Sequence, residues 1–401
     1  MKMLNFQSPS CDDPAAFSAA AVRADMLEFH GENRPSYGAY YAAGMVAAVV
    51  GILPCVQKIL VSDKPAVLFH NNPDGSYRLD SNGLPKISIT RVGQLLLSLQ
   101  GLPYREQVRQ EIHTKNFHPE VELIYPLIDD PLFRGAQEGL MTNRLPDGQL
   151  YGQCLNQRLD AIRKEAKKAN FRKKVSDWVK PVIKKQRTLE AYLDTVVGSV
   201  ECALVVKVDL GNMPAYQHVA TPDEMMQDFR ELLDQGKEQG IFNDLIGHVV
   251  RLDHNLQKGY FLSAVFIFDE SQPRKSGDMT TTIGWFWRNY ISPHHGHAFW
   301  YCDKCACKHH GIGLIDRQDW RQREYFATHT AAYMARIDEF VRLNIEGKDP
   351  LWWIDRGELS SKIKIEGKKV KWPRHEQSQP LLNAFNMRWP SIPAMQNRTG
   401  L

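Results

Sequence analysis

Residues 258–271, KGYFLSAVFIFDES, carry the strand pattern on which the fold of the second half of the chain depends. The run is strongly apolar, follows a Lys-Gly turn and leaves through Asp-Glu-Ser, which is typical of a buried β-strand. Because the side chains of a strand alternate between its two faces, Phe261 and Ser263 are expected on one face, turned toward the last helix. Leu262 and Ala264 are expected on the other face.

The segments on either side of this strand complete an α+β unit. Residues 203–210, ALVVKVDL, predict another buried strand. Thr221, Pro222 and Glu224 form a capping box with proline at the first helical position, which indicates a helix. Further strands are expected at 247–253, 298–302 and 311–315, and helices at 277–291 and 317–343. The order predicts a ferredoxin-like or palm-type antiparallel sheet with helices on one face.

The first half of the chain reads as a separate mixed α/β domain of unknown role. An apolar segment at 37–53 predicts a buried helix, since it is short for a membrane span. Short strands at 65–70 and 86–90, joined by Asn/Asp/Gly turns, precede a helix predicted at 91–113. The expected organisation is an N-terminal domain (1–155), a basic helical linker (156–190), a palm domain (191–350) and a basic tail (351–401).

Composition limits the class of protein without naming it. The 401 residues are 43% hydrophobic and carry a formal net charge of +4, which describes a globular, mildly basic chain. Seven scattered cysteines do not form the dense framework of a small secreted domain, and no signal peptide opens the chain. We therefore expect a cytoplasmic protein with no membrane partner.

Eight segments of the second half, in register, carry a resemblance to a known family. From about residue 184 to 359 the chain resembles the inovirus-type replication initiators, also called the YagK/YfjJ C-terminal domain family, of filamentous phages, prophages and other mobile elements. The matching segments are RTLEAYLD (187–194), VVKVDL (205–210), IGHVVRLD (246–253), KGYFLSAVFIFDES (258–271), WFWRNYI (285–291), GHAFWYC (296–302), HGIGLID (310–316) and AAYMARIDEF (331–340).

That family is similar to the HUH endonucleases, which nick one DNA strand. The resemblance implies a tyrosine nucleophile at Tyr333, with Arg336 at the basic position of a Tyr-x-x-Lys pattern. It also implies a His-x-His pair on a strand that holds Mg²⁺ or Mn²⁺, but the corresponding positions here are Phe261 and Ser263. A phenyl ring cannot ligate a metal, so metal-dependent nicking is expected to be impaired or absent.

Two other metal sites remain open. Asp209, with Asp253 and His254, would form a replacement site for a divalent ion at the strand ends. The dense run HHGHAFWYCDKCACKHH (294–310) would supply structural zinc. Its candidate ligands are Cys302, Cys305, Cys307 and His309. The alternative for the Cys/His run is a turn with free thiols, and the alternative for the two acids is that they are solvated at the strand ends. No cofactor is certain.

The basic segment 158–187 is the main indication of a DNA partner. It holds twelve Lys or Arg against three acids, and such charge gives salt-dependent affinity for phosphates. A solvated helix or linker is the alternative. Aromatic residues that would stack on unpaired bases of single-stranded DNA are Trp178, Trp285, Trp287 and Tyr290. The candidate DNA-binding residues are Lys167, Lys168, Arg172, Lys173, Lys174, Lys184, Lys185 and Arg187.

The sequence thus predicts a mobile-element DNA-binding protein built on a rolling-circle replication-initiator scaffold. One alternative is an active single-strand endonuclease that uses Tyr333. Another is a regulatory or protein-interaction module of a mobile element.

Overall fold

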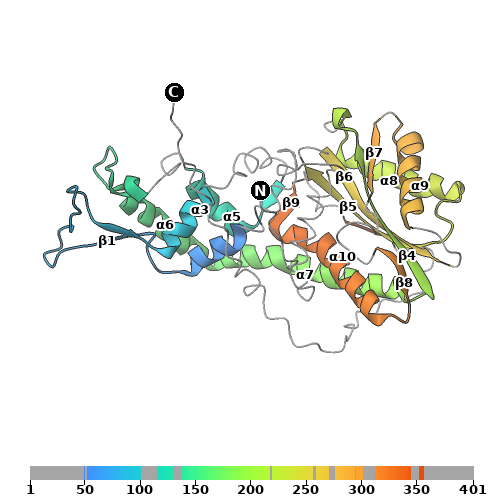
Figure 1. The fold of residues 1–401 in the computed structure, drawn as a ribbon, viewed down its shortest axis with the longest axis horizontal. Coiled ribbons are helices and arrows are strands. Elements are labelled where there is room, and N and C mark those ends of the chain that lie inside the picture. Colours follow the sequence, from blue (N-terminus) through green and yellow to red (C-terminus); the bar gives the residue numbers. More distant parts are fainter. Residues whose placement is uncertain are drawn as a thin grey trace, which may run out of the picture.

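A computed structural model shows that the second half of the chain is built on a six-stranded antiparallel sheet (Figure 1). The structure describes residues 49, 52–100, 115–130, 138–216, 219–255, 259–270, 276–293, 295–300, 312–344 and 352–355. The sheet consists of β4 (Cys202–Asn212), β5 (Leu245–Asn255), β6 (Gly259–Asp269), β7 (Gly296–Trp300), β8 (Gly313–Asp316) and β10 (Trp352–Asp355). The strand order is β10-β5-β6-β4-β7, and β8 also pairs with β4.

The topology is the split βαβ arrangement that the sequence predicts. Helix α8 (Pro222–Glu238) connects β4 to β5, and β6 lies between these two strands. Helix α9 (Ser276–Phe286) connects β6 to β7, and β4 lies between them. The predicted capping box of α8 is present, with the Thr221 hydroxyl accepting from the Glu224 backbone N–H at 3.3 Å. The mixed α/β fold class is therefore confirmed, with a ferredoxin-like order of strands and helices.

Helices cover both faces of this sheet (Figure 1). One face packs against α8 and α9, and Leu262, Ala264, Phe266 and Phe268 of β6 contribute to that core. The other face packs against α7 (Ala169–Val197) and α10 (Trp320–Phe340), and receives Val265 and Ile267 of the same strand. The alternation predicted for 258–271 is therefore present, but the helices are not confined to one face.

Two boundaries of the second half differ from the prediction. The last helix was expected to reach residue 343, but it ends at Phe340, and Val341–Leu343 form strand β9. β9 pairs antiparallel with β3 (Lys115–Phe117), so the chain returns to the first half after α10. Residues 352–355, expected in a basic tail, form β10, which pairs with β5 at the edge of the sheet.

The first half has its own apolar core. A helix over 52–61 and the other elements surround a cluster that includes Ile59, Leu96 and Ile124. The remaining elements are β1 (Val67–Phe69), β2 (Ile87–Ile89), α3 (Arg91–Gln100), α5 (Pro119–Ile128), the 3₁₀ turn η2 (Glu138–Thr142) and α6 (Tyr151–Lys167). The strands predicted at 65–70 and 86–90 are the antiparallel pair β1 and β2. The predicted buried helix at 37–53 lies mostly outside the described residues.

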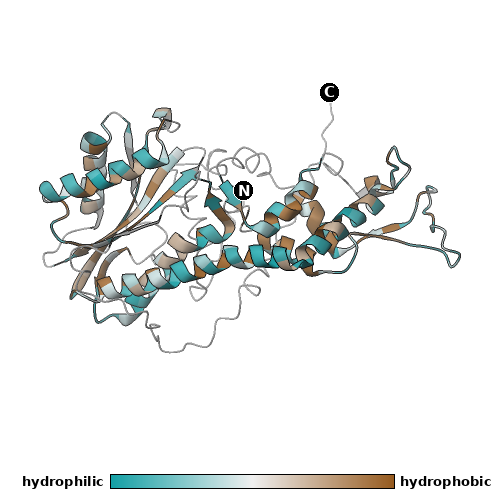
Figure 2. Cartoon of the chain, turned by 180° about the vertical axis from the view of Figure 1, so that it is seen from behind, coloured by the Kyte–Doolittle hydropathy of each residue, from teal (hydrophilic) through white to brown (hydrophobic). Residues whose placement is uncertain are grey.

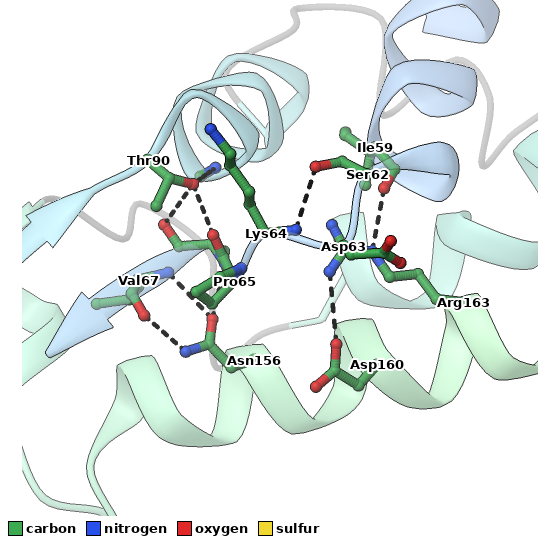
Figure 3. Close-up of polar contacts among 12 residues, drawn as sticks. Ile59, Ser62, Asp63, Lys64, Pro65, Val67, Thr90, Asn156, Asp160 and Arg163 are labelled. Carbon is green, nitrogen blue, oxygen red and sulfur yellow. Dashed lines mark hydrogen bonds and ion pairs between the residues drawn. The ribbon is translucent and has the colours of Figure 1, made fainter.

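Side chains of α6 fix this lobe by binding backbone groups of its other elements (Figure 3). The Asn156 amide accepts from the backbone N–H groups of Ala66 at 2.8 Å and Val67 at 3.0 Å, and donates to the Val67 carbonyl at 2.7 Å. The Arg163 guanidinium, which is buried, donates to the Ile59 carbonyl at 3.1 Å. These bonds satisfy polar backbone groups that would otherwise be costly to bury.

Helix α7 joins the two halves (Figure 1). It contains 29 residues and is about 43 Å long. The segment 156–190, expected to be a linker, lies within α6 and α7, and several of its apolar side chains are buried in the two cores. Leu159 belongs to the first core, whereas Leu189 belongs to the core between the sheet and α10. Among the described residues, no helix is both long enough and apolar enough to cross a membrane.

Candidate nucleic-acid interface

The strand positions that would carry the metal ligands face α10 but are buried. Phe261 and Ser263 lie on the face of β6 that packs against α7 and α10. A Cβ atom on Gly211 of β4 would lie 3.1 Å from the Phe261 Cβ, so glycine allows the close approach of these two strands. This position therefore serves packing, and it offers no ligand.

A buried guanidinium lies in the same row of the sheet. Ser263 pairs in register with Asp209 of β4 on one side and with Arg251 of β5 on the other. The Arg251 side chain donates to the Met334 carbonyl of α10 at 2.7 Å and forms an ion pair with Asp338 of α10 at 3.0 Å. The positive charge in this row is the guanidinium of Arg251, and its contacts with Met334 and Asp338 connect β5 to α10.

Further charges surround this pair. The Arg251 Nε atom lies 3.5 Å from a carboxylate oxygen of Asp253, and Lys185 of α7 lies 3.7 Å from Asp338. Arg251 is 4% exposed and Asp338 is 1% exposed. Buried ions are retained only where partners compensate for lost hydration, and this network supplies two cations and two carboxylates. Lys185, a predicted DNA contact, is partly exposed and pairs with the buried Asp338.

The proposed replacement metal site is not formed. Asp253 and Asp209 belong to the α10 face, but the strand β6 lies between them. The His254 ring packs on Tyr260, with ring centroids 4.8 Å apart, on the opposite face of the sheet. Within the described ranges, no group of three or more His, Cys, Asp or Glu side chains could hold a metal ion. The hypothesis of a site with these three ligands was wrong, because strand alternation separates His254 from the two acids.

The region of Tyr333, the predicted nucleophile, is only partly described. Tyr333 lies within α10, but its side chain lies outside the described part of the structure. Arg336, expected to bias a phosphate toward that tyrosine, instead binds the Glu339 carboxylate through two nitrogens at 3.1 and 2.9 Å. Burial raises the pKa of nearby Glu190, and the hydrogen bond from Gln186, followed by the charges of Arg187 and Arg336, partly offsets the rise. The Arg336 guanidinium is thus committed to an acid on its own helix.

The predicted zinc ligands Cys302, Cys305, Cys307 and His309 lie outside the described residues. The described cysteines, Cys55, Cys154 and Cys202, are free thiols.

The basic segment forms a stripe on the exposed face of α7. The exposed residues Lys173, Lys180, Lys184 and Arg187 follow one another at spacings of seven, four and three residues. These spacings return to one side of a helix, and the buried residues of α7, such as Leu189, lie on the other side. Figure 2 shows hydrophilic residues along much of α7. We call these four residues the α7 stripe; it extends over about 21 Å of helix.

Surface ion pairs occupy several of the predicted DNA contacts. Arg172, Lys184 and Arg187 form no ion pair within the described residues, whereas five lysines do. The pairs are Lys167–Asp63 (3.1 Å), Lys168–Glu165 (2.5 Å), Lys173–Asp177 (2.5 Å), Lys174–Glu122 (3.0 Å) and Lys185–Asp338 (3.7 Å). Exposed pairs of this kind contribute at most about 1 kcal/mol, so a phosphate can displace the acid, except at the Lys185 pair, whose acid is buried.

Beside the stripe lies an open pocket of about 440 Å³. Its lining residues are Asn170, Lys173, Lys174, Asp177, Trp178 and Arg342. Trp178 does not present a free ring there, because the Arg342 guanidinium carbon lies 3.9 Å from the ring centroid. The indole N–H donates to the Glu339 carbonyl at 2.8 Å, and Arg342 also binds the Trp178 carbonyl. Trp178 therefore connects α7 to the segment at the end of α10, and its ring is not free to stack on a base as expected.

The aromatic residues near α9 divide into two classes. Trp287 is fully buried, and its indole N–H donates to the Gly211 carbonyl at 3.0 Å, so it cannot stack on a base as expected. Trp285 and Tyr290 are 54% and 55% exposed.

Comparison of the chain with family models, with curated proteins and with solved structures finds no match.

Two features of this region were missed by the sequence reasoning. Lys180 was not among the predicted DNA contacts, although the periodicity that links it to Lys173, Lys184 and Arg187 is visible in the sequence. The Arg251–Asp338 pair was also missed. Its only signal was a charged residue at a core position of the predicted strand 247–253.

Proposed function

We propose that this protein binds single-stranded DNA through the α7 stripe, on an initiator-like palm that does not nick DNA with a metal ion. The resemblance of eight segments to replication initiators supports a role in a phage, prophage or other mobile element. The observation that carries the proposal is the alignment of Lys173, Lys180, Lys184 and Arg187 on one exposed helix face.

The geometry of the stripe suits a phosphate backbone. Four cations within about 21 Å can neutralise several phosphates of one strand, and each neutralised phosphate releases condensed counterions. Lys174 and Arg342 beside the stripe extend the positive surface into the adjoining pocket. Affinity from these contacts is independent of DNA sequence and falls as salt rises.

The loss of metal-dependent nicking rests on the α10 face of the sheet. Phe261 supplies no ligand, and the row that includes Ser263 contains Arg251, whose charge is balanced by Asp338. A divalent ion placed beside this guanidinium would meet like charge. The missing Lewis acid would remove several kcal/mol of transition-state stabilisation from phosphodiester cleavage.

The binding experiment changes the four stripe residues together to glutamine. With a single-stranded oligonucleotide titrated at several salt concentrations, the slope of log affinity against log salt should fall by about 3, from about 0.7 for each lost phosphate contact. Affinity at low salt should fall as well. The same affinity and slope in the variant and the wild-type protein would refute the proposal.

A control variant matches the change in net charge. Lys58, Lys64, Lys86 and Lys237 are exposed residues outside α7. Their replacement by glutamine also removes four positive charges, so the slope should stay close to that of the wild-type protein. An equal fall in both variants would attribute binding to overall charge and would contradict a localised interface.

A further inference from the structure

A π-helical turn at the end of α9 creates an exposed pair of aromatic rings. Helix α9 continues into the π turn η4 (Trp287–Ile291), where the Ser292 backbone N–H donates to the Trp287 carbonyl, five residues earlier, at 2.9 Å. In an α-helix, residues five apart point about 140° away from each other. The wider π turn reduces this angle, and π turns are frequent at functional sites.

The two residues that this turn brings together are Trp285 and Tyr290. Their ring centroids lie 5.3 Å apart, with an angle of 61° between the ring planes. Each side chain is more than half exposed, although large aromatic rings usually bury much of their surface. The turn therefore positions two rings toward solvent at a defined angle.

Neighbouring residues hold the Trp285 and Tyr290 side chains in place. Phe286, which is buried, stacks on the Tyr290 ring at 5.0 Å, and the Asn289 amide donates to the Trp285 carbonyl at 2.7 Å. The buried Trp287 anchors the turn to β4 through its bond to the Gly211 carbonyl. Such support lowers the conformational entropy that a ligand would have to remove on binding.

The surroundings of the pair are polar. Thr281, Thr282, Arg288 and Asn289 are exposed on the same helical segment. The core of a protein interface is a contiguous apolar patch, whereas Trp285 and Tyr290 are the only exposed large hydrophobic side chains among the described residues of α9 and η4. Isolated aromatic faces beside a cation are the means by which proteins bind unpaired bases and their phosphates.

We propose that Trp285 and Tyr290 form a stacking platform for an unpaired nucleobase, with Arg288 next to the attached phosphate. This inference rests on the proposed single-stranded DNA binding and adds a second contact to it. Helix α9 and the α7 stripe lie on opposite sides of the sheet (Figure 1), so a strand that touches both passes around a sheet edge.

The test replaces both rings, in a Trp285→Ala, Tyr290→Ala variant of the full chain. We expect affinity for a long oligothymidylate to fall about tenfold, because stacking contributes of the order of 1 to 3 kcal/mol per base. The salt slope should stay unchanged, since stacking releases no counterions. Affinity for duplex DNA should also stay unchanged, because its bases are already stacked. Trp285→Phe, Tyr290→Phe should restore most of the binding.

Trp320 provides a matched control. It is an exposed tryptophan on α10, with the Arg321 guanidinium 5.4 Å from its ring centroid, and its replacement by alanine should leave DNA affinity unchanged. Unaltered oligothymidylate affinity in the double alanine variant would overturn the platform, as would an equal loss for duplex DNA. If the stripe variant then still shows the reduced salt slope, the platform alone is refuted. If the wild-type protein binds no single-stranded DNA, both proposals are refuted.

Discussion

The buried pair of Arg251 and Asp338 makes the sharpest test of how the α10 face of the sheet is stabilised. Arg251→Met removes the guanidinium but keeps a long side chain that can fill most of its volume. The change leaves Asp338, 1% exposed, with Lys185 at 3.7 Å as its cationic partner. It also removes the donor to the Met334 carbonyl. Uncompensated burial of charge is expected to dominate the effect.

The expected cost follows from the geometry. Removing one partner of a buried ion pair costs about 3 to 5 kcal/mol, and the Lys185 contact places the value at the lower end, about 3 kcal/mol. Asp338→Asn should cost less, because the amide keeps the shape and Asp253 still lies 3.5 Å from Arg251. Urea unfolding of each variant, followed by circular dichroism, gives the free energy of unfolding from the midpoint at constant m-value.

The double variant Arg251→Met, Asp338→Leu is the control. Replacing both ions by apolar groups leaves no buried charge without its partner, so it should be more stable than Arg251→Met alone. An Arg251→Met variant that loses less than about 1 kcal/mol would refute the reasoning. The same conclusion would follow if the costs of Arg251→Met and Asp338→Leu, each also measured alone, simply added in the double variant.

Two further predictions concern protonation and cleavage. Burial, followed by the Arg342 charge, lowers the pKa of His118 from 6.5 to about 4. Between pH 6.5 and 4, His118 therefore binds a proton in the unfolded chain but not in the folded one. The free energy of unfolding is highest above about pH 6.5 and falls as the pH is lowered toward 4, by about 3 kcal/mol for the full shift. His118→Asn, which can still cap α5, should lose less stability between pH 7 and 4.5 in urea titrations; equal losses in both proteins would contradict the assignment. With Mg²⁺ or Mn²⁺, purified protein should form no covalent adduct with single-stranded origin DNA, and an adduct abolished by Tyr333→Phe would show active nicking. The variant Phe261→His, Ser263→His should not cleave DNA unless Arg251 is also replaced, because its guanidinium would repel the metal ion.

The sequence by itself determined the elements whose signals are local. Alternation fixed the faces of β6, because successive side chains of a strand point in opposite directions. The capping box at Thr221 fixed the start of α8, because all of its partners lie within one turn. The order of these elements was enough to predict the split βαβ sheet. The cation stripe on α7 follows the same helical periodicity, but the predicted contacts did not include Lys180, and the structure was needed to show which cations are exposed on one face.

Only the tertiary structure decided what the site contains. Arg251 meets the Met334 carbonyl across 83 positions of sequence, and Trp178 meets the Glu339 carbonyl across 161, so no local pattern could pair them. The contact between the exposed rings of Trp285 and Tyr290 involves a π turn, whose register differs from that of the helix that the sequence predicts. Burial, partner and direction are properties of the packed chain, and they separate a ligand or stacking residue from a structural one.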